Sequence, residues 1–384
     1  MKNKVFIAIF FALAAPASLA NDVSSDWNFA EALKHPNDPS EGLGAVKSFA
    51  ISPPEGAKLP GFSELTDYIL AAPDQEDAGT CLYMSLTGIL EWWTARLNPS
   101  MSRALNGAVD LSERFTVNAA SRPAHRTGVR NWRTDSIEIF NSLGHAATNR
   151  SYPFAKGYFR QSSNGSYVGA VPSEPGALFG TLFNWVNHVS TANLERVPLP
   201  RFKREVLFED PRGDAWNVGV APPDLAALVR LKLETRKAPV HVIYNHYGYW
   251  HAVVVVGFDD EGDSKNCSFV EGFRKYMKER PLELREKAAD ETLPAPRRQQ
   301  MLAQARAQEN TSRRIEAAWA NGGGCSGKGT FYVRDSIYGS DEEPVYDYAS
   351  SLPAARGHYS KRLVSLEYDW IKYLANHAVQ IYVE

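Results

Sequence analysis

The chain has 384 residues, 44% of them hydrophobic, and its 42 lysines and arginines nearly balance 44 aspartates and glutamates, which gives a formal net charge of -2. This balance excludes the strongly basic composition that is typical of nucleic-acid-binding proteins. The length and the apolar content allow a large core, in one large domain with insertions or in two domains.

The N-terminus has the three parts of a secretory signal peptide. Lys2 and Lys4 precede an apolar stretch, and small residues ending at Ala20 form a cleavage site. We therefore expect residues 1–20 to be removed on export to the periplasm or the extracellular space; a retained N-terminal anchor is the alternative. Removing the two lysines moves the formal charge from -2 to about -4. No later stretch approaches the ~20 apolar residues of a membrane span, so we expect no span in the mature protein.

The mature chain changes from helical to strand patterns along its length. Residues 21–58 are rich in proline, serine and aspartate and predict an extended arm ahead of a domain over 59–384. Helical periodicity and stop signals predict helices at residues 80–97, 134–144 and 222–237. Runs of β-branched and aromatic residues predict strands at residues 239–246, 251–258, 329–336 and 363–368. Helices first and strands second indicate an α+β fold.

A charged, alanine-rich segment interrupts the strand region at residues 262–327. We expect it to be an inserted helical hairpin, broken near Pro281 and near Pro294–Pro296. Cys267 and Cys325 flank it and could pair as a disulfide at its base. An exported protein with three cysteines is expected to hold one disulfide and one free thiol, which leaves Cys81 as the free thiol.

Four residues supply every role that a cysteine nucleophile needs. Cys81 lies at or just before a helix N-terminus, where the helix dipole favours a thiolate. His251 begins an apolar strand and is the best candidate base; a buried core histidine is the alternative. Asp335 ends another strand and could orient the imidazole, although a strand-end aspartate is commonly a turn residue. Gln75 precedes Cys81 by six residues and is a candidate oxyanion donor.

Two other motifs are set aside. The stretch GGGCSGKGT (322–330) nearly matches a P-loop, but Gly329 stands where Ser or Thr must hold Mg²⁺, so we expect a flexible linker. His241, His246 and His251 are five residues apart, and on one strand an odd step places side chains on opposite faces, so we expect no shared zinc site.

Five collinear segments, which cover roughly residues 59–260 and 328–384, resemble the papain-like (C1) cysteine proteases. They are similar to that family's nucleophile helix with its oxyanion glutamine, its LSEQ-type helix, its YPY-type segment, its histidine strand pair and its KNSWG block. The segments are LPGFSELTDYILAAPDQEDAGTCLYMS (59–85), VDLSERFTVNAAS (109–121), SIEIFNSLGHAATNRSYPFAKGYF (136–159), APVHVIYNHYGYWHAVVVVGFDD (238–260) and GKGTFYVRDSIYG (327–339).

The sequence departs from the family pattern at several positions. Asp335 stands in place of the usual asparagine, Ile337 in place of the aromatic residue that shields the histidine, and Leu82 in place of the aromatic residue after the nucleophile. The family's first-half disulfide cysteines are missing, as is its double-glycine strip, unless TGVRNW (127–132) replaces it. The departures make catalysis better supported than any particular specificity.

The resemblance implies a two-lobed fold, with a helical left lobe and an antiparallel β-rich right lobe, and hydrolysis of peptide bonds in peptide or protein substrates. Cys81 would attack, His251 would transfer the proton, Asp335 would orient the imidazole and Gln75 would bind the oxyanion. We expect no metal or organic cofactor and a monomer, with the insertion 262–327 as a solvated excursion, a lid or a partner-binding element. The alternatives are another acyl transferase or amidase of this superfamily, or a catalytically impaired binding protein.

Overall fold

The computed structural model describes residues 81–98, 109–116, 137–149, 151, 159–161, 167–170, 194–211, 217–264, 267–336, 358–360 and 363–383. The helices are α2 (Cys81–Leu97), α5 (Ile137–Leu143), α7 (Leu225–Arg236), α8 (Ser268–Ala288), α9 (Ala295–Asn321) and α10 (Tyr368–Leu374). The strands are β1 (His145–Ala147), β2 (Phe159–Gln161), β3 (Tyr167–Ala170), β4 (Arg196–Pro198), β5 (Lys203–Glu209), β6 (Val240–His246), β7 (Tyr249–Ser264), β8 (Gly327–Arg334), β9 (His358–Ser360), β10 (Leu363–Glu367) and β11 (Ala375–Tyr382).

Several predictions concern residues outside these ranges. They are the signal peptide and the arm, Gln75, the segment 127–132, the YPY-type segment at 152–154 and Ile337.

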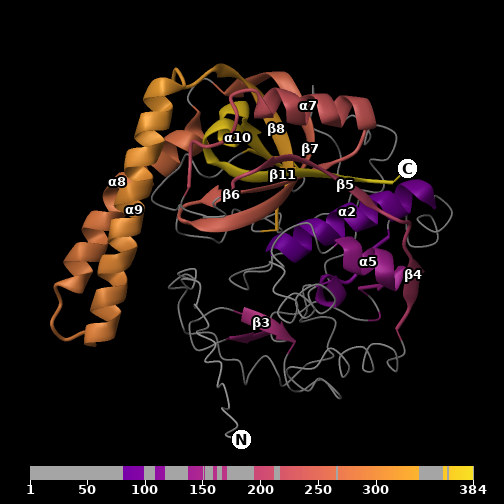
Figure 1. Ribbon diagram of the computed structural model, residues 1–384, viewed down its shortest axis with the longest axis horizontal. Coiled ribbons are helices and arrows are strands. Elements are labelled where there is room, and N and C mark those ends of the chain that lie inside the picture. Colours follow the sequence, from indigo (N-terminus) through magenta and orange to yellow (C-terminus); the bar gives the residue numbers. More distant parts are fainter. Residues whose placement is uncertain are drawn as a thin grey trace, which may run out of the picture.

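A seven-stranded sheet in the order β5-β11-β6-β7-β8-β10-β9 forms the centre of the fold (Figure 1). Every neighbouring pair in it is antiparallel. Together with the helices, this sheet confirms the predicted α+β class.

Helices cover both faces of the sheet. Val253 and Val255 of β7 point into a core formed with α7, α8 and α10. Val254 and Val256 point the opposite way, into a core formed with α2. Because alternate residues of a strand face opposite sides and both sides are buried, β7 reads as a continuous apolar run rather than an alternating one.

The helix that begins at Cys81 lies between the sheet and a smaller group of elements, α5 with the β1–β4 pair (Figure 1). Ile137 and Phe140 of α5 belong to the same buried core as Ile89 and Leu90 of α2. The predicted end of α5 is confirmed, because Gly144 follows it with φ 68°, a conformation that glycine adopts without a Cβ clash.

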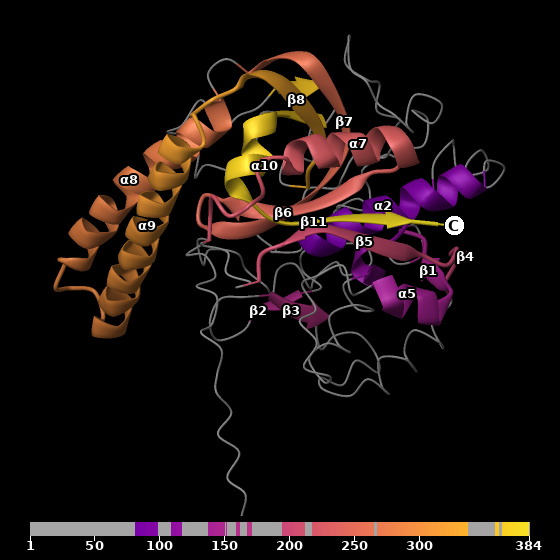
Figure 2. The same ribbon diagram turned by 45° about the horizontal axis from the view of Figure 1, so that its top comes forward.

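The insertion is a helical hairpin of α8 and α9 that extends from the sheet as an arm in both views (Figures 1 and 2). Cys267 and Cys325 form the predicted disulfide at its base, and Cys81 is a free thiol. The prediction of a break near Pro281 is wrong, since α8 continues through this buried proline to Ala288. A proline inside a helix removes a backbone hydrogen bond and costs ~3 kcal/mol. The packing of α8 against α9 offsets this cost.

The boundaries of the insertion also differ from the prediction. β7 continues to Ser264, beyond residue 262. At the other end, β8 begins at Gly327, so the expected flexible linker at 322–330 is a turn followed by a strand.

The C-terminal strand β11 was not predicted. It has a central place in the sheet, between β5 and β6, yet its sequence carries Asn376, His377 and Gln380. These side chains are buried, and the amide of Gln380 donates hydrogen bonds to the carbonyl oxygens of Lys232 and Ala238 at 3.1 and 3.0 Å. In the described part of the chain, no helix combines the length and the apolar character needed to cross a membrane.

Candidate active site

Cys81 is the first residue of α2 and is partly exposed. The first N–H groups of a helix have no partner within the helix and carry the positive end of its dipole, so a negative charge is favoured there. Leu82, Ile243 and Ala252 form a small apolar cluster beside the thiol. The Sγ atom lies 3.9 Å from the carbonyl oxygen of Trp250, the residue before His251.

His251 and Asp335 form a buried pair. His251 is the third residue of β7, and Asp335 follows the last residue of β8, the neighbouring strand. The Nε2 atom of His251 lies 2.6 Å from Oδ1 of Asp335, and the two side chains are 0% and 1% exposed. Because burial shields this pair from water, the imidazole is held in one orientation by the carboxylate.

The thiol of Cys81 is the second polar partner of the imidazole. Burial by itself lowers the pKa of His251, but the charge and hydrogen bond of Asp335, together with those of Cys81, raise it from 6.5 to about 10. Nε2 is hydrogen-bonded to Asp335, and the contribution of Cys81 to the raised pKa of His251 places the thiol near the imidazole ring. The arrangement favours the imidazolium form of His251 beside the Cys81 thiol, and it is as a thiolate that a cysteine attacks a carbonyl carbon.

Arg334 fixes the end of β8 to the helix that carries Cys81. Its Nη1 donates to the carbonyl oxygen of Met84 at 3.1 Å, and its Nη2 pairs with the Glu91 carboxylate at 3.3 Å. Gly88 makes room for this guanidinium, because a Cβ at that position would lie 2.7 Å from Cζ of Arg334. Arg334 immediately precedes Asp335, so the same contacts set the position of the carboxylate relative to the thiol.

Two buried carboxyl groups surround the Arg334 guanidinium. Burial raises the pKa of Glu91 well above its usual value, although Arg334 opposes the effect. Burial and the neighbouring Asp110 raise the pKa of Glu113 to about 8. Glu91 also accepts a hydrogen bond from the backbone N–H of Leu111 at 2.9 Å, which attaches the LSER segment to α2.

A second histidine packs against His251, which corrects the argument made from the sequence. His246 and His251 do not share a strand: a turn at Tyr247–Gly248 joins β6 to β7 and brings both rings to the same face, with centroids 5.3 Å apart. His241 lies on the opposite face, where its Nε2 is 2.9 Å from Ser85 Oγ. Burial and the charge of His251 lower the pKa of His246 well below its usual value, so it is a neutral wall of the site.

The structure brings three of the four predicted residues into one site, namely Cys81, His251 and Asp335. Gln75 lies outside the described residues. From the sequence, the aromatic cluster YNHYGYW (244–250), which contains His246, is either core and turn packing or a wall beside His251, and the structure places His246 beside His251. The sequence reasoning missed Arg334 at the site and Phe269 behind His246 and Tyr244. The two-residue turn in YNHYGYW was the available signal for His246. A hairpin with this turn pairs Tyr244 with His251, and His246 lies two residues along the strand from Tyr244, on the same face of the sheet.

The described residues contain one cluster with the donor types of a metal site, Cys267, Cys325 and Asp369. Its two sulfurs are joined in the disulfide and so are not available as thiolate ligands.

Comparison with known proteins adds no relative to this picture. No protein-family model matches the sequence, and no curated protein matches it.

Proposed function

We propose that this protein is an exported cysteine peptidase of the papain-like type, with Cys81, His251 and Asp335 as its triad. The observation that carries the proposal is the buried 2.6 Å contact between His251 and Asp335, with the Cys81 thiol as the other partner of the imidazole. The three residues come from three separate places in the fold: the start of α2, the start of β7 and the end of β8.

In the proposed reaction, the Cys81 thiolate attacks the carbonyl carbon of a peptide bond. The imidazolium of His251 then gives its proton to the leaving amine, and an acyl-enzyme remains on Sγ. Water attacks this thioester while His251 accepts its proton, which releases the acid and restores the thiol. We assign the oxyanion to the backbone N–H of Cys81 and the side-chain amide of Gln75.

The same proposal covers the finer architecture. α2, α5 and the β1–β4 pair would form the helical left lobe, and the seven-stranded sheet the β-rich right lobe, with α8 and α9 inserted between β7 and β8. Cys81, at the first turn of α2, would then lie where the two lobes meet.

The test combines covalent labelling with hydrolysis. We expect an epoxysuccinyl peptide to label Cys81 in the native protein, to fail on Cys81→Ser and to react slowly with His251→Ala, as mapped by mass spectrometry. Unlabelled protein should cleave denatured casein. Labelling at the rate of a free thiol in water, or labelling without cleavage of any peptide, would contradict the peptidase assignment. A transfer product formed with an added amine would identify an acyl transferase.

A further inference from the structure

Aromatic rings connect the first turn of α8 to His251. The Phe269 ring lies 5.6 Å from the His246 ring and 6.0 Å from the Tyr244 ring, centroid to centroid. The His246 and Tyr244 rings in turn lie 5.3 and 5.6 Å from the His251 ring. All four side chains are at most 2% exposed. The inserted arm therefore contributes a side chain that packs against the two rings behind the imidazole.

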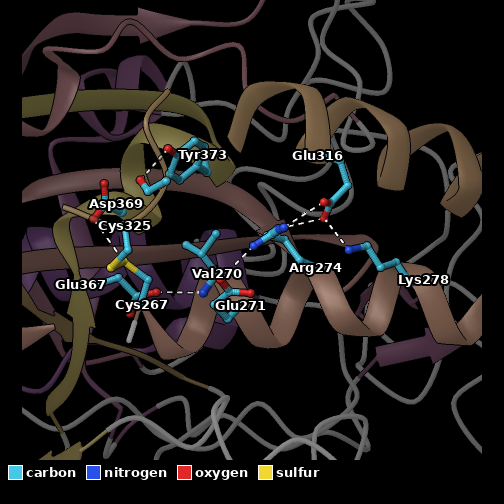
Figure 3. Close-up of polar contacts among 11 residues, drawn as sticks. Cys267, Val270, Glu271, Arg274, Lys278, Glu316, Cys325, Glu367, Asp369 and Tyr373 are labelled. Atoms are coloured by element: carbon cyan, nitrogen blue, oxygen red, sulfur yellow. Dashed lines mark hydrogen bonds and ion pairs between the residues drawn. A yellow bond between two sulfur atoms is a disulfide. The ribbon is translucent and has the colours of Figure 1, made fainter. Parts of the chain in front are cut away.

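The base of the hairpin, where α8 begins and α9 ends, is held in place by three separate contacts (Figure 3). The disulfide joins Cys267, just before α8, to Cys325, just after α9. The backbone N–H of Val270 donates to the Glu367 carboxylate at 2.8 Å. The backbone N–H of Ser326 donates to Asp369 at 2.8 Å. Cys267 itself has a φ of 39°, a left-handed backbone conformation that residues other than glycine rarely adopt. The contacts around Cys267 must maintain this conformation.

Within the part of the chain that the structure describes, the apolar core of the distal half of the arm is formed by the arm itself. A separate apolar cluster there consists of residues of α8, α9 and their connection, namely Leu284, Ala288, Leu293, Met301, Leu302 and Ala305. The proximal half belongs to the main core, which includes Phe269, Val270, Phe273, Met277 and Ile315. We call the half of the arm whose residues belong to the main core the root, and the half that contains the separate cluster of Leu284, Met301 and Ala305 the tip.

We propose that Phe269 is a positioning residue for His251, acting through the rings of His246 and Tyr244, and that the Cys267–Cys325 disulfide keeps it in place. The inserted arm then supports the base through its root instead of covering the site through its tip. The inference rests on the proposed function for its consequence, since His251 is the base of that reaction.

The physical reason is exclusion of water from one side of the imidazole. Among the described residues, the titratable groups around His251 are Asp335, Cys81, Tyr244 and His246. α8 adds the uncharged Phe269, which packs against the His246 and Tyr244 rings. Removing the Phe269 ring leaves space into which these two rings can shift and water can enter, and water close to the His251–Asp335 pair weakens the attraction between the two charges by raising the local dielectric constant. The imidazolium then loses its proton at a lower pH.

The test measures the charge of His251 without a peptide substrate. Cys81 is alkylated with iodoacetate and with iodoacetamide across pH 5–11, and the ratio of the two rates is plotted against pH. An imidazolium attracts the anionic reagent, so the ratio falls where His251 loses its proton, and thiolate reactivity cancels. In Phe269→Ala we expect this fall to move to lower pH by about one unit or more, which is a tenfold change in the proton equilibrium. Phe269→Leu refills most of the space, so we expect its ratio to fall at a pH close to that of the wild-type protein.

Two controls separate positioning from general stability. Phe273→Ala removes an equally buried ring one turn along α8, which packs against Tyr247, and we expect lower stability with an unchanged ratio profile. Replacing residues 283–309 by a short Gly-Ser turn removes the tip and keeps the root, and we expect the wild-type profile. Reduction of the disulfide should move the profile in the direction of Phe269→Ala.

A profile of folded Phe269→Ala that superimposes on the wild-type profile overturns the inference, as does an equal shift on removal of the tip. If Phe269→Ala is too unstable to purify, Phe269→Val removes less volume and is expected to shift the profile in the same direction by a smaller amount. Loss of casein cleavage is a separate result: a protein that cleaves no peptide but shows these shifts would contradict the peptidase proposal and leave the positioning role standing.

Discussion

Asp335→Ala removes the carboxylate that holds His251 in its charged form. The pKa of His251 is raised from 6.5 to about 10 against the effect of burial. An interval of about 3.5 pH units corresponds to about 5 kcal/mol in favour of the imidazolium. Without Asp335, burial acts against the charge with only Cys81 opposing it, so we expect the imidazole to be largely neutral at pH 7. General acid–base catalysis contributes on the order of 10²- to 10⁴-fold, and we expect kcat/KM to fall by a factor in that range.

Asp335→Asn is the matched conservative change. The amide oxygen can still accept a hydrogen bond from Nε2, as in triads that use asparagine, so the ring keeps its orientation and we expect a smaller loss than for Asp335→Ala. Asp210→Ala is the control, because Asp210 is also buried at the end of a strand, but its carboxylate accepts a hydrogen bond from Asn217 at 2.8 Å instead of from an imidazole. The assay is casein hydrolysis as a function of pH, with the alkylation ratio as a second measurement.

Stability gives an independent measurement of the same pair. The folded-state pKa of His251 is raised above its unfolded value, so its contribution is complete below pH 6.5 and is lost as pH rises through about 10. We expect the free energy of unfolding of the wild-type protein to fall over this interval, and Asp335→Ala to lack most of that fall. Asp335→Ala curves that superimpose on wild type in both rate and stability would refute the reasoning and place the third triad member elsewhere.

Three further changes test the support of the site. Gly88→Ala should destabilise the protein by about 1–3 kcal/mol in urea unfolding, because the added Cβ meets Arg334; helix propensity alone predicts the opposite sign. Burial raises the pKa of Glu367 to about 7, so the free energy of unfolding of the wild-type protein falls as pH rises through that value. Glutamine does not titrate, so between pH 4 and pH 8 the free energy of unfolding of Glu367→Gln should rise by about 3 kcal/mol relative to that of wild type. Parallel curves of stability against pH would contradict this. The double change Cys267→Ser/Cys325→Ser opens a loop with a sequence separation of 58 and should cost about 4 kcal/mol by the chain-entropy relation, measured against reduced wild type as control.

Much of the fold could be predicted because its signals are local. The helical period after Cys81, the stop at Gly144 and the β-branched runs of β6, β7 and β8 each depend on residues close together in the chain. The odd number of cysteines predicted one disulfide and one free thiol, and the positions of Cys267 and Cys325 on either side of the insertion predicted which two would pair. The sequence could also predict the candidate site residues Cys81, His251 and Asp335. Each lies at or near the end of a predicted helix or strand, where side chains from different elements can contact one another.

The features that the sequence could not determine depend on contacts between distant segments. β11 contains polar residues that become acceptable inside the sheet only because backbone carbonyl groups of other segments accept from Gln380. Pro281 stays within α8 because α9 packs against that helix. The meeting of His246 with His251 requires the turn at residues 247–248, and the contact with Phe269 requires the insertion to return to the sheet. Burial and strand register decide these placements, and both belong to the tertiary structure because neither is encoded by the spacing of residues along the chain.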